Sequence, residues 1–244
     1  MPKETREERK KRAEKILVLL KKTYPDAKIA LNFTNPWELL VATILSAQCT
    51  DKRVNIVTEK LFAKYKTFDD YLKASPKEFE QDIKSTGFYR NKAANILKTA
   101  QILKEKFGGK VPKTMAEMIS LAGVARKTAN VVLGNAYKIV EGIAVDTHVL
   151  RNSQRLRLVD MEYIRGKKEA TFTRRGREVV DYKRDADPNK IEKELMNILD
   201  RKDWFSFNYL IIDHGRAICK AQNPNCGICP IRVYCPSSRV AQNI

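Results

Sequence analysis

The sequence has no apolar run that approaches the roughly 18–20 consecutive residues a transmembrane helix needs. Its N-terminal stretch, MPKETREERKKRAEK, also lacks the apolar core of a secretory signal peptide. These absences argue against membrane insertion and secretion, and they predict a cytoplasmic protein. Thiols stay reduced in that compartment, so we expect the five cysteines to be free or metal-bound.

Acidic residues are too few to balance the basic ones. The chain has 47 Lys and Arg against 29 Asp and Glu, which gives a formal net charge of +18 and a pI near 9.7. Basic patches on a folded domain attract phosphate polyanions. The charge therefore favours a nucleic-acid partner over the other candidate, an anionic membrane surface.

The C-terminal region has a single CxxC pair and lacks the second one that a zinc ribbon uses. Its cysteines follow the spacing C-x6-C-x2-C-x5-C, formed by Cys219, Cys226, Cys229 and Cys235. Thiolate ligands select zinc or iron–sulfur clusters. The wide, uneven loop suits a 4Fe-4S cluster better than one tetrahedral zinc ion, and disulfides are the third possibility.

Hydrophobic periodicity is helical along most of the chain, which predicts an all-α fold. In PWELLVATILSA the apolar residues Trp37, Leu40, Val41, Ile44 and Leu45 repeat at i, i+3, i+4, i+7 and i+8, which predicts one buried face. Helices are expected over residues 5–23, 36–47, from 51, 75–87, 89–107, 114–121, 126–138, 147–157, 189–200 and 204–218.

Residues 160–186 interrupt the helical pattern. EATFT and REVVDY alternate apolar and polar residues around a glycine-containing turn, which predicts a small β-hairpin. Residues 163–184 hold eight Lys and Arg against three acids. The basic residues are either part of a solvated surface or a nucleic-acid contact, and for the tip arginines Arg174, Arg175 and Arg177 we expect contact with phosphate.

The segment LAGVARKTANVVLGNAY, residues 121–137, reads as a tight turn that opens into a helix. Gly123 supplies backbone freedom, and Leu121 and Val124 are expected to anchor the turn in the core. The N–H groups at the start of a helix can bind a phosphate without reading its base.

Four segments together resemble the endonuclease III family of helix-hairpin-helix DNA glycosylases. The turn resembles L-P-G-V-G-x-K-T-A, ILSAQCTD (44–51) resembles LLSAQATD, IAVDTHV (143–149) looks like the catalytic aspartate segment, and the cysteine spacing matches the cluster motif. The resemblance spans about residues 13–236, apart from the basic stretch. Ala122 and Ala125 replace the family's Pro and second Gly, but Ala125 should lie at the helix start, where φ is ordinary.

The resemblance implies a bifunctional DNA glycosylase and AP lyase of base excision repair that acts on oxidised pyrimidines. Its expected partner is double-stranded DNA with damaged bases or abasic sites, at the nucleoid. Lys127 would be the nucleophile that forms a Schiff base, and a helix N-terminus disfavours a second cation and so favours its neutral amine. Asp146 would be the catalytic carboxylate, and it is also a natural helix N-cap. His148 and His214 are expected to pack, because four thiolates already complete the cluster.

A base within a duplex must be flipped out before it can react. Gln48 aligns with the residue that fills the gap, and Phe88 and Tyr89 resemble the hydrophobic wedge. With the turn itself, the residues expected to bind DNA are Gln48, Phe88, Tyr89, Gly123, Ala125, Arg126, Arg174, Arg175 and Arg177.

The resemblance implies a monomer with two helical domains. Residues 29–140 would form a six-helix barrel that carries the helix-hairpin-helix, and residues 1–28 with 141–244 would form the cluster domain. Lys127 and Asp146 would then lie on opposite walls of one cleft. The alternatives are a monofunctional mismatch glycosylase, against which Lys127 argues, and a non-catalytic iron–sulfur DNA-binding protein.

Overall fold

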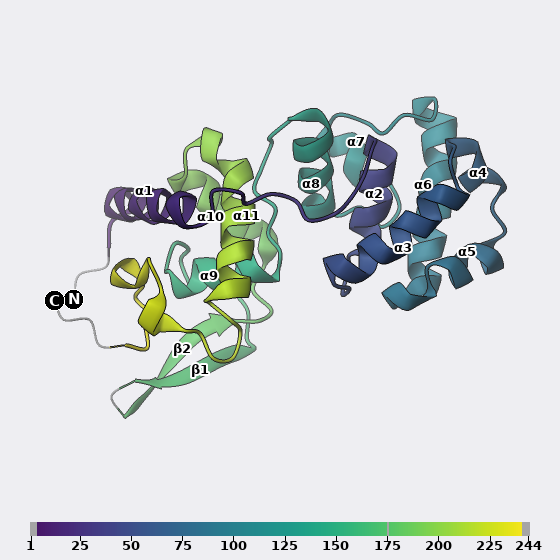
Figure 1. Cartoon of the computed structure of the whole chain (residues 1–244). Helices are drawn as coiled ribbons and strands as arrows, with labels where there is room; N and C mark the ends of the chain where they lie inside the picture. The colour runs from purple at the N-terminus through teal and green to yellow at the C-terminus, as the bar shows by residue number, and fades with distance from the viewer. Residues whose placement is uncertain (1–3, 175, 241–244) are drawn as a thin grey trace. The chain divides into compact units, whose positions relative to one another are not determined.

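The computed structural model describes residues 4–174 and 176–240, which divide into two compact units (Figure 1). One unit is Ile29–Glu141, and the other joins the N-terminal segment up to Lys28 to the chain from Gly142 onward. Among the residues described, no helix combines the length and apolarity that crossing a membrane would require.

The unit Ile29–Glu141 is built of helices, as the periodicity predicts. They are α2 (Pro36–Leu45), α3 (Asp51–Lys64), α4 (Phe68–Lys73), α5 (Pro76–Asp82), the 3-10 turn η1 (Lys84–Thr86), α6 (Tyr89–Phe107), α7 (Met115–Ile119) and α8 (Arg126–Tyr137). Helix α4 was not predicted from the sequence, although it is no shorter than the predicted α7. A capping box between Thr67 and Asp70 marks its start and could have revealed it.

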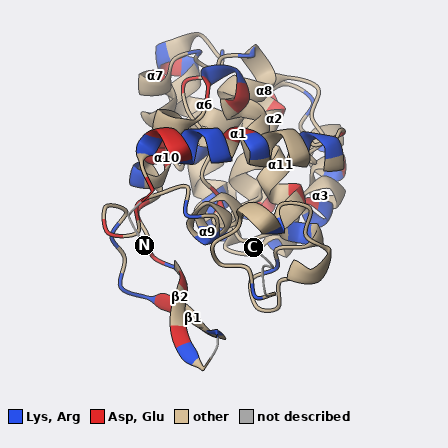
Figure 2. Cartoon of the chain, turned by 90° about the vertical axis from the view of Figure 1, so that its left-hand side faces the viewer, with Lys and Arg blue, Asp and Glu red and all other residues tan. Residues whose placement is uncertain are grey.

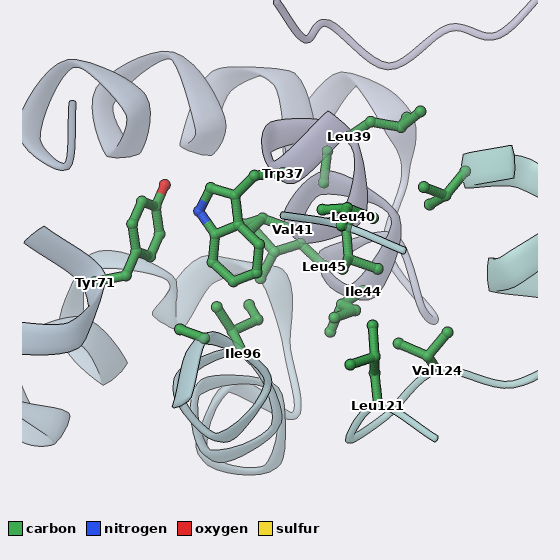
Figure 3. Close-up of a cluster of buried hydrophobic side chains, with 14 of the residues drawn as sticks. Trp37, Leu39, Leu40, Val41, Ile44, Leu45, Tyr71, Ile96, Leu121 and Val124 are labelled. Atoms are coloured by element: carbon green, nitrogen blue, oxygen red, sulfur yellow. The ribbon is translucent and has the colours of Figure 1, made fainter. Parts of the chain in front are cut away.

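Helix α2 is the centre of this unit's core (Figure 3). We predicted one buried face, but every residue from Leu39 to Leu45 is buried, because α2 packs against α3, α6 and α8 on different sides. Asn35 caps its N-terminus through Glu38 N, and Pro36 occupies the first turn. An all-round apolar helix is therefore the central element around which the other helices pack.

The second unit contains the N-terminal helix and the chain from Gly142 onward. Its elements are α1 (Arg6–Thr23), α9 (Thr147–Arg155), β1 (Glu169–Arg174), β2 (Arg177–Lys183), α10 (Pro188–Ile198), α11 (Arg201–Ala217), η2 (Cys226–Ile228) and η3 (Arg232–Tyr234). Helix α1 packs on α10 and α11 and buries Ile16 and Leu20. The expected helix at 204–218 begins earlier, at Arg201.

The predicted β-hairpin is present. Strands β1 and β2 pair antiparallel, with Phe172 opposite Val179 and an irregularity between Ala170 and Thr171. The basic residues are not confined to the hairpin. Figure 2 shows Lys and Arg on many elements, α1 included. Strand β2 packs against α9, so the hairpin is attached to the helical core of its unit.

Helices α9 and α11 approach closely at Gly215. A β-carbon at this position would lie 2.9 Å from Asn152 Nδ2 and even closer to His148 Nδ1, both on α9. A separation under 3 Å requires one of the groups to move. Packing therefore requires a glycine here, in the last turn of α11, although glycine is a poor helix former.

Gly215→Ala should destabilise the protein. In the last turn of a helix, better propensity would contribute only about 0.5 kcal/mol, but forcing a methyl group between packed helices costs about 1–3 kcal/mol. We expect a net loss of about 0.5–2.5 kcal/mol in the free energy of unfolding, measured by urea denaturation. An unchanged or higher midpoint would mean that α9 and α11 separate without cost.

Candidate functional site

The turn between α7 and α8 is fixed by its buried residues and by Gly123. Leu121 and Val124 are 3% and 6% exposed, which confirms that they anchor the turn in the core. Thr99 Oγ1 donates to Ala122 O at 2.9 Å. Gly123 has φ 72°, and a β-carbon there would lie 2.7–2.9 Å from the Asn95 side chain, so conformation and space both require glycine.

Helix α8 begins directly after this turn. Its N-cap, Ala125, has φ −89° and ψ 169°, the ordinary extended conformation predicted for this alanine. Alanine provides no side-chain cap. Arg126 and Lys127 form the first turn of the helix, and both are half-buried. The family's second glycine is therefore not needed here for backbone conformation.

Asp146 is the N-cap of α9 in the other unit. Its Oδ1 accepts from His148 N at 2.9 Å and from Val149 N at 2.8 Å. The carboxylate therefore has a fixed direction, and it is half-buried. Further along the helix, Arg151 donates to Cys219 O at 3.1 Å, and its guanidinium lies 3.2 Å from His148 Nδ1. Helix α9 thus connects Asp146 to the cysteine loop.

Gln48 and Phe88 occupy the tips of two loops in the unit Ile29–Glu141. Both have the left-handed backbone conformation, with φ 53° and 47°. This conformation is uncommon for residues other than glycine, and it clusters at functional sites. Gln48 is exposed and Phe88 is 63% exposed, whereas Tyr89 is half-buried and packs against the core. Of the two expected wedge aromatics, Phe88 is the one that faces solvent.

The four C-terminal cysteines line one cavity, together with Ile218, Pro224 and Ile231. All five cysteines of the chain are free thiols, so the disulfide alternative is wrong. Cys49, the fifth cysteine, is half-buried and packs against the core. Four soft ligands around a mainly apolar cavity fit an iron–sulfur cluster, which binds through thiolates.

Burial disfavours the thiolate form of these cysteines. It raises the pKa of Cys229 to about 11 and that of Cys235 to about 12. Burial also raises the pKa of Cys219, although nearby Arg155 opposes this. These thiols must therefore lose their protons when they bind metal. Because the loop closes around the cluster, the free energy of cluster binding also contributes to folding of the loop.

His214 packs beside the cysteines, as expected. It is 2% exposed, its Nδ1 lies 3.2 Å from Tyr24 Oη, and its Nε2 lies 3.7 Å from Cys229 Sγ. Burial lowers the pKa of His214 to about 4, so its imidazole is neutral at pH 7.

A buried ion pair joins the hairpin to the cysteine loop, and the sequence analysis did not anticipate it. Asp181 on β2 accepts from Arg155 Nε and Nη2 at 2.7–3.0 Å, and each residue is 2% exposed. The same guanidinium donates to Lys220 O at 2.7 Å, Ala221 O at 2.8 Å and Cys219 Sγ at 3.3 Å. Arg155 therefore binds both segments at once.

The hairpin makes further contacts with its unit. Gln154 pairs with the backbone of Lys183, donating to its carbonyl at 3.0 Å and accepting from its N–H at 2.7 Å. At the tip, Arg174 donates to Pro236 O at 2.8 Å, Arg177 is exposed, and Arg175 lies outside the described residues. One of the three predicted phosphate contacts, Arg174, thus already binds a carbonyl within the chain.

Comparison with known proteins agrees with this geometry. Residues 41–178 match the family model described as HhH-GPD superfamily base excision DNA repair protein, and residues 219–235 match the iron-sulfur binding domain of endonuclease III. The second match covers the cysteine run and no more. Endonuclease III of Synechocystis sp. is 46% identical over 233 residues, which cover 96% of this chain and 95% of that protein.

The chain belongs to the endonuclease III family. Endonuclease III of Bacillus subtilis is 43% identical over 87% of this chain and 86% of its own length. Among solved structures, a trapped endonuclease III–DNA covalent intermediate has a TM-score of 0.81 at 40% identity, covering 94% of this chain and 97% of that one.

Family membership establishes the activity and the cofactor. The chain is a bifunctional DNA glycosylase and AP lyase of base excision repair that binds DNA, and its cluster is 4Fe-4S. The zinc alternative is therefore wrong. Cys219, Cys226, Cys229 and Cys235 would hold the cluster, and Arg155 donates toward the sulfur of the first of them.

Asp181→Asn should loosen the cysteine loop. The amide keeps the shape but removes the charge that balances buried Arg155, and breaking a buried pair costs about 3–5 kcal/mol. We expect a chelator to remove iron from the variant several times faster than from the parent. The loss is measured as the fall in cluster absorbance near ~400 nm. Glu178→Gln on the same strand is the control, since Glu178 is exposed. Equal rates in both variants and the parent would show that the pair does not stabilise the loop.

Proposed function

We propose that Lys127 is the nucleophile of the glycosylase and lyase reactions. The observation that carries this is its position on the first turn of α8, directly after the Gly123 turn. Phosphate bound by the N-terminal backbone of that helix would hold the DNA beside the amine. The match of residues 41–178 to the base excision repair family supports the same assignment.

The chemistry follows from an amine as the attacking group. Lys127 Nζ attacks C1′ of an extruded nucleotide, and the C1′–N bond breaks as the base leaves. Ring opening gives a Schiff base between Nζ and C1′, which acidifies the C2′ proton. Removal of that proton expels the 3′ phosphate by β-elimination. An activated water could complete only the first step, so a lysine accounts for both activities.

Asp146 is proposed to stabilise the positive charge that develops on the sugar and to accept the proton of the lysine amine. Preorganised charges aimed at developing charge are often the largest contribution to catalysis. The two N–H groups that Asp146 caps keep its carboxylate in one orientation. The amine comes from one unit and the carboxylate from the other. A single copy contains both, so we propose a monomer.

The substrate we propose is a duplex with an oxidised pyrimidine or an abasic site. Gln48 would fill the space left by the extruded nucleotide, and Phe88, with Tyr89 behind it, would separate the neighbouring bases. The turn at Gly123 and Ala125, with Arg126, would bind phosphate. For the hairpin tip we propose phosphate contact through exposed Arg177. A panel of duplexes with single damaged bases tests the lesion class.

Lys127→Gln should abolish base excision and borohydride crosslinking to lesion DNA, because the amide cannot form a Schiff base. DNA binding, measured by fluorescence anisotropy, should persist. Lys138→Gln is the control, since it removes the same charge from the other end of α8 and should crosslink normally. A Lys127→Gln variant that still nicks abasic DNA near the parent rate would rule out Lys127 as the nucleophile.

Asp146→Asn should lower single-turnover base excision by roughly 10²-fold or more, the scale of losing one charge-stabilising group. Asparagine caps helices about as well as aspartate, so the fold should hold. Asp187→Asn makes the same change at the N-cap of α10, where Asp187 accepts from Asn189 N, and should leave excision unchanged. If both variants react at the parent rate, Asp146 is only a helix cap.

A further inference from the structure

Lys92 is a buried cation that the reaction does not use. It lies on the inner side of α6 and is 4% exposed. Its Nζ donates to Leu45 O and to Thr86 O, each at 2.8 Å. Burial lowers the pKa of Lys92. A lysine is rarely buried unless its ammonium is well bound, since an unsatisfied buried charge is costly.

The two carbonyls that Lys92 binds mark the bases of the two exposed loops described above. Leu45 is the last residue of α2, three positions before Gln48. Thr86 ends η1, two positions before Phe88. The segments are distant in sequence, and only tertiary structure brings both carbonyls to one ammonium. No backbone hydrogen bond recorded between the described residues joins one loop to the other.

The backbone hydrogen bonds within each loop, among the described residues, are short-range. Cys49 N donates to Ser46 O at 3.1 Å in one, and Gly87 N donates to Lys84 O at 3.3 Å in the other. Such bonds fix the shape of each turn but not the separation between the turns. Packing of η1 on α3, the helix after the Gln48 loop, brings the two segments together. The ammonium adds a directional constraint, because moving either carbonyl away leaves a buried charge partly unsatisfied.

We propose that Lys92 is a positioning residue that fixes the Gln48 and Phe88 loops relative to each other, so that both side chains enter the duplex together. The inference rests on the DNA roles proposed above for Gln48 and Phe88. Extruding a nucleotide requires the wedge and the gap-filling group to act on the same base step. Loops that are already aligned avoid the entropic cost of ordering them on DNA.

The experiment compares two substrates of the holoenzyme. One is a duplex with a single thymine glycol, which must be unpaired and extruded. The other is single-stranded DNA with a preformed abasic site, which needs no extrusion. In Lys92→Met, single-turnover excision from the duplex should fall about 10- to 100-fold, as expected when reacting groups are misplaced by about 1 Å. Strand cleavage of the single-stranded substrate should stay within about threefold of the parent, since misplaced loops leave the chemistry unchanged.

Lys98→Met is the matched control. It removes the same charge from an exposed position of the same helix, so it reproduces any loss of attraction to DNA. It should retain the parent rate on both substrates. Parallel losses on both substrates in Lys92→Met would mean that Lys92 supports folding alone, and this would overturn the inference.

A double-mutant cycle separates the inference from the function on which it rests. Phe88→Ala and Gln48→Ala should each slow excision from the duplex. Combining Lys92→Met with Phe88→Ala should be little worse than the slower single variant, because both act on one loop. Full additivity would show that Lys92 does not act through the wedge. Parent rates in Phe88→Ala and Gln48→Ala would instead refute the proposed DNA roles, whatever Lys92→Met does.

Discussion

Buried positive charge that is bound by backbone carbonyls organises both units. A strongly basic chain has few carboxylates to pair with its cations, and a buried cation still needs acceptors. Lys92 donates to two loop carbonyls in one unit. In the other, half-buried Arg12 donates to Leu156 O at 2.6 Å and Tyr234 O at 3.1 Å beside its ion pair with Glu4. Arg155 pairs with Asp181 and donates to the carbonyls after Cys219. In each case one side chain joins segments that are distant in the sequence.

This arrangement explains what holds the cysteine loop in place, although the loop buries few apolar side chains of its own. Helix α9 carries Asp146 as its N-cap, Arg151 at mid-helix and Arg155 at its last residue. The arginines bind the Cys219 segment while Asp146 caps the helix. The proposed catalytic carboxylate and the cluster loop are therefore attached to the same helix. Few contacts separate a change at one end of α9 from the group at its other end.

The hairpin is the part of the chain where charge pattern alone misleads. Its basic residues suggest a surface that binds phosphate, yet its one buried acid, Asp181, makes an ion pair with Arg155 in which both side chains are buried. Arg174 likewise binds the carbonyl of Pro236. These contacts make the hairpin a structural support of the cysteine loop, and only its exposed part, Arg177 included, is available for DNA.

Local pattern in the sequence determined most of the fold. The helical period, the capping residues and the Gly-containing hairpin turn depend on near neighbours, so they can be read without a structure. The cysteine spacing and the turn before Lys127 are likewise local, and the comparisons confirmed the family and the cluster they indicated. The roles of Lys127 and Asp146 remain predictions. Short α4, whose six residues span less than two turns, escaped this kind of reading.

Tertiary structure alone decided which charges are buried and what they bind. Lys92 is one of 47 basic residues and Asp181 one of 29 acids, and nothing beside them in the sequence distinguishes them. Their partners lie 47 and 26 positions away. A buried charge is stable only where acceptors from distant segments converge on it. That convergence depends on how the helices pack, so it exists only in the folded chain.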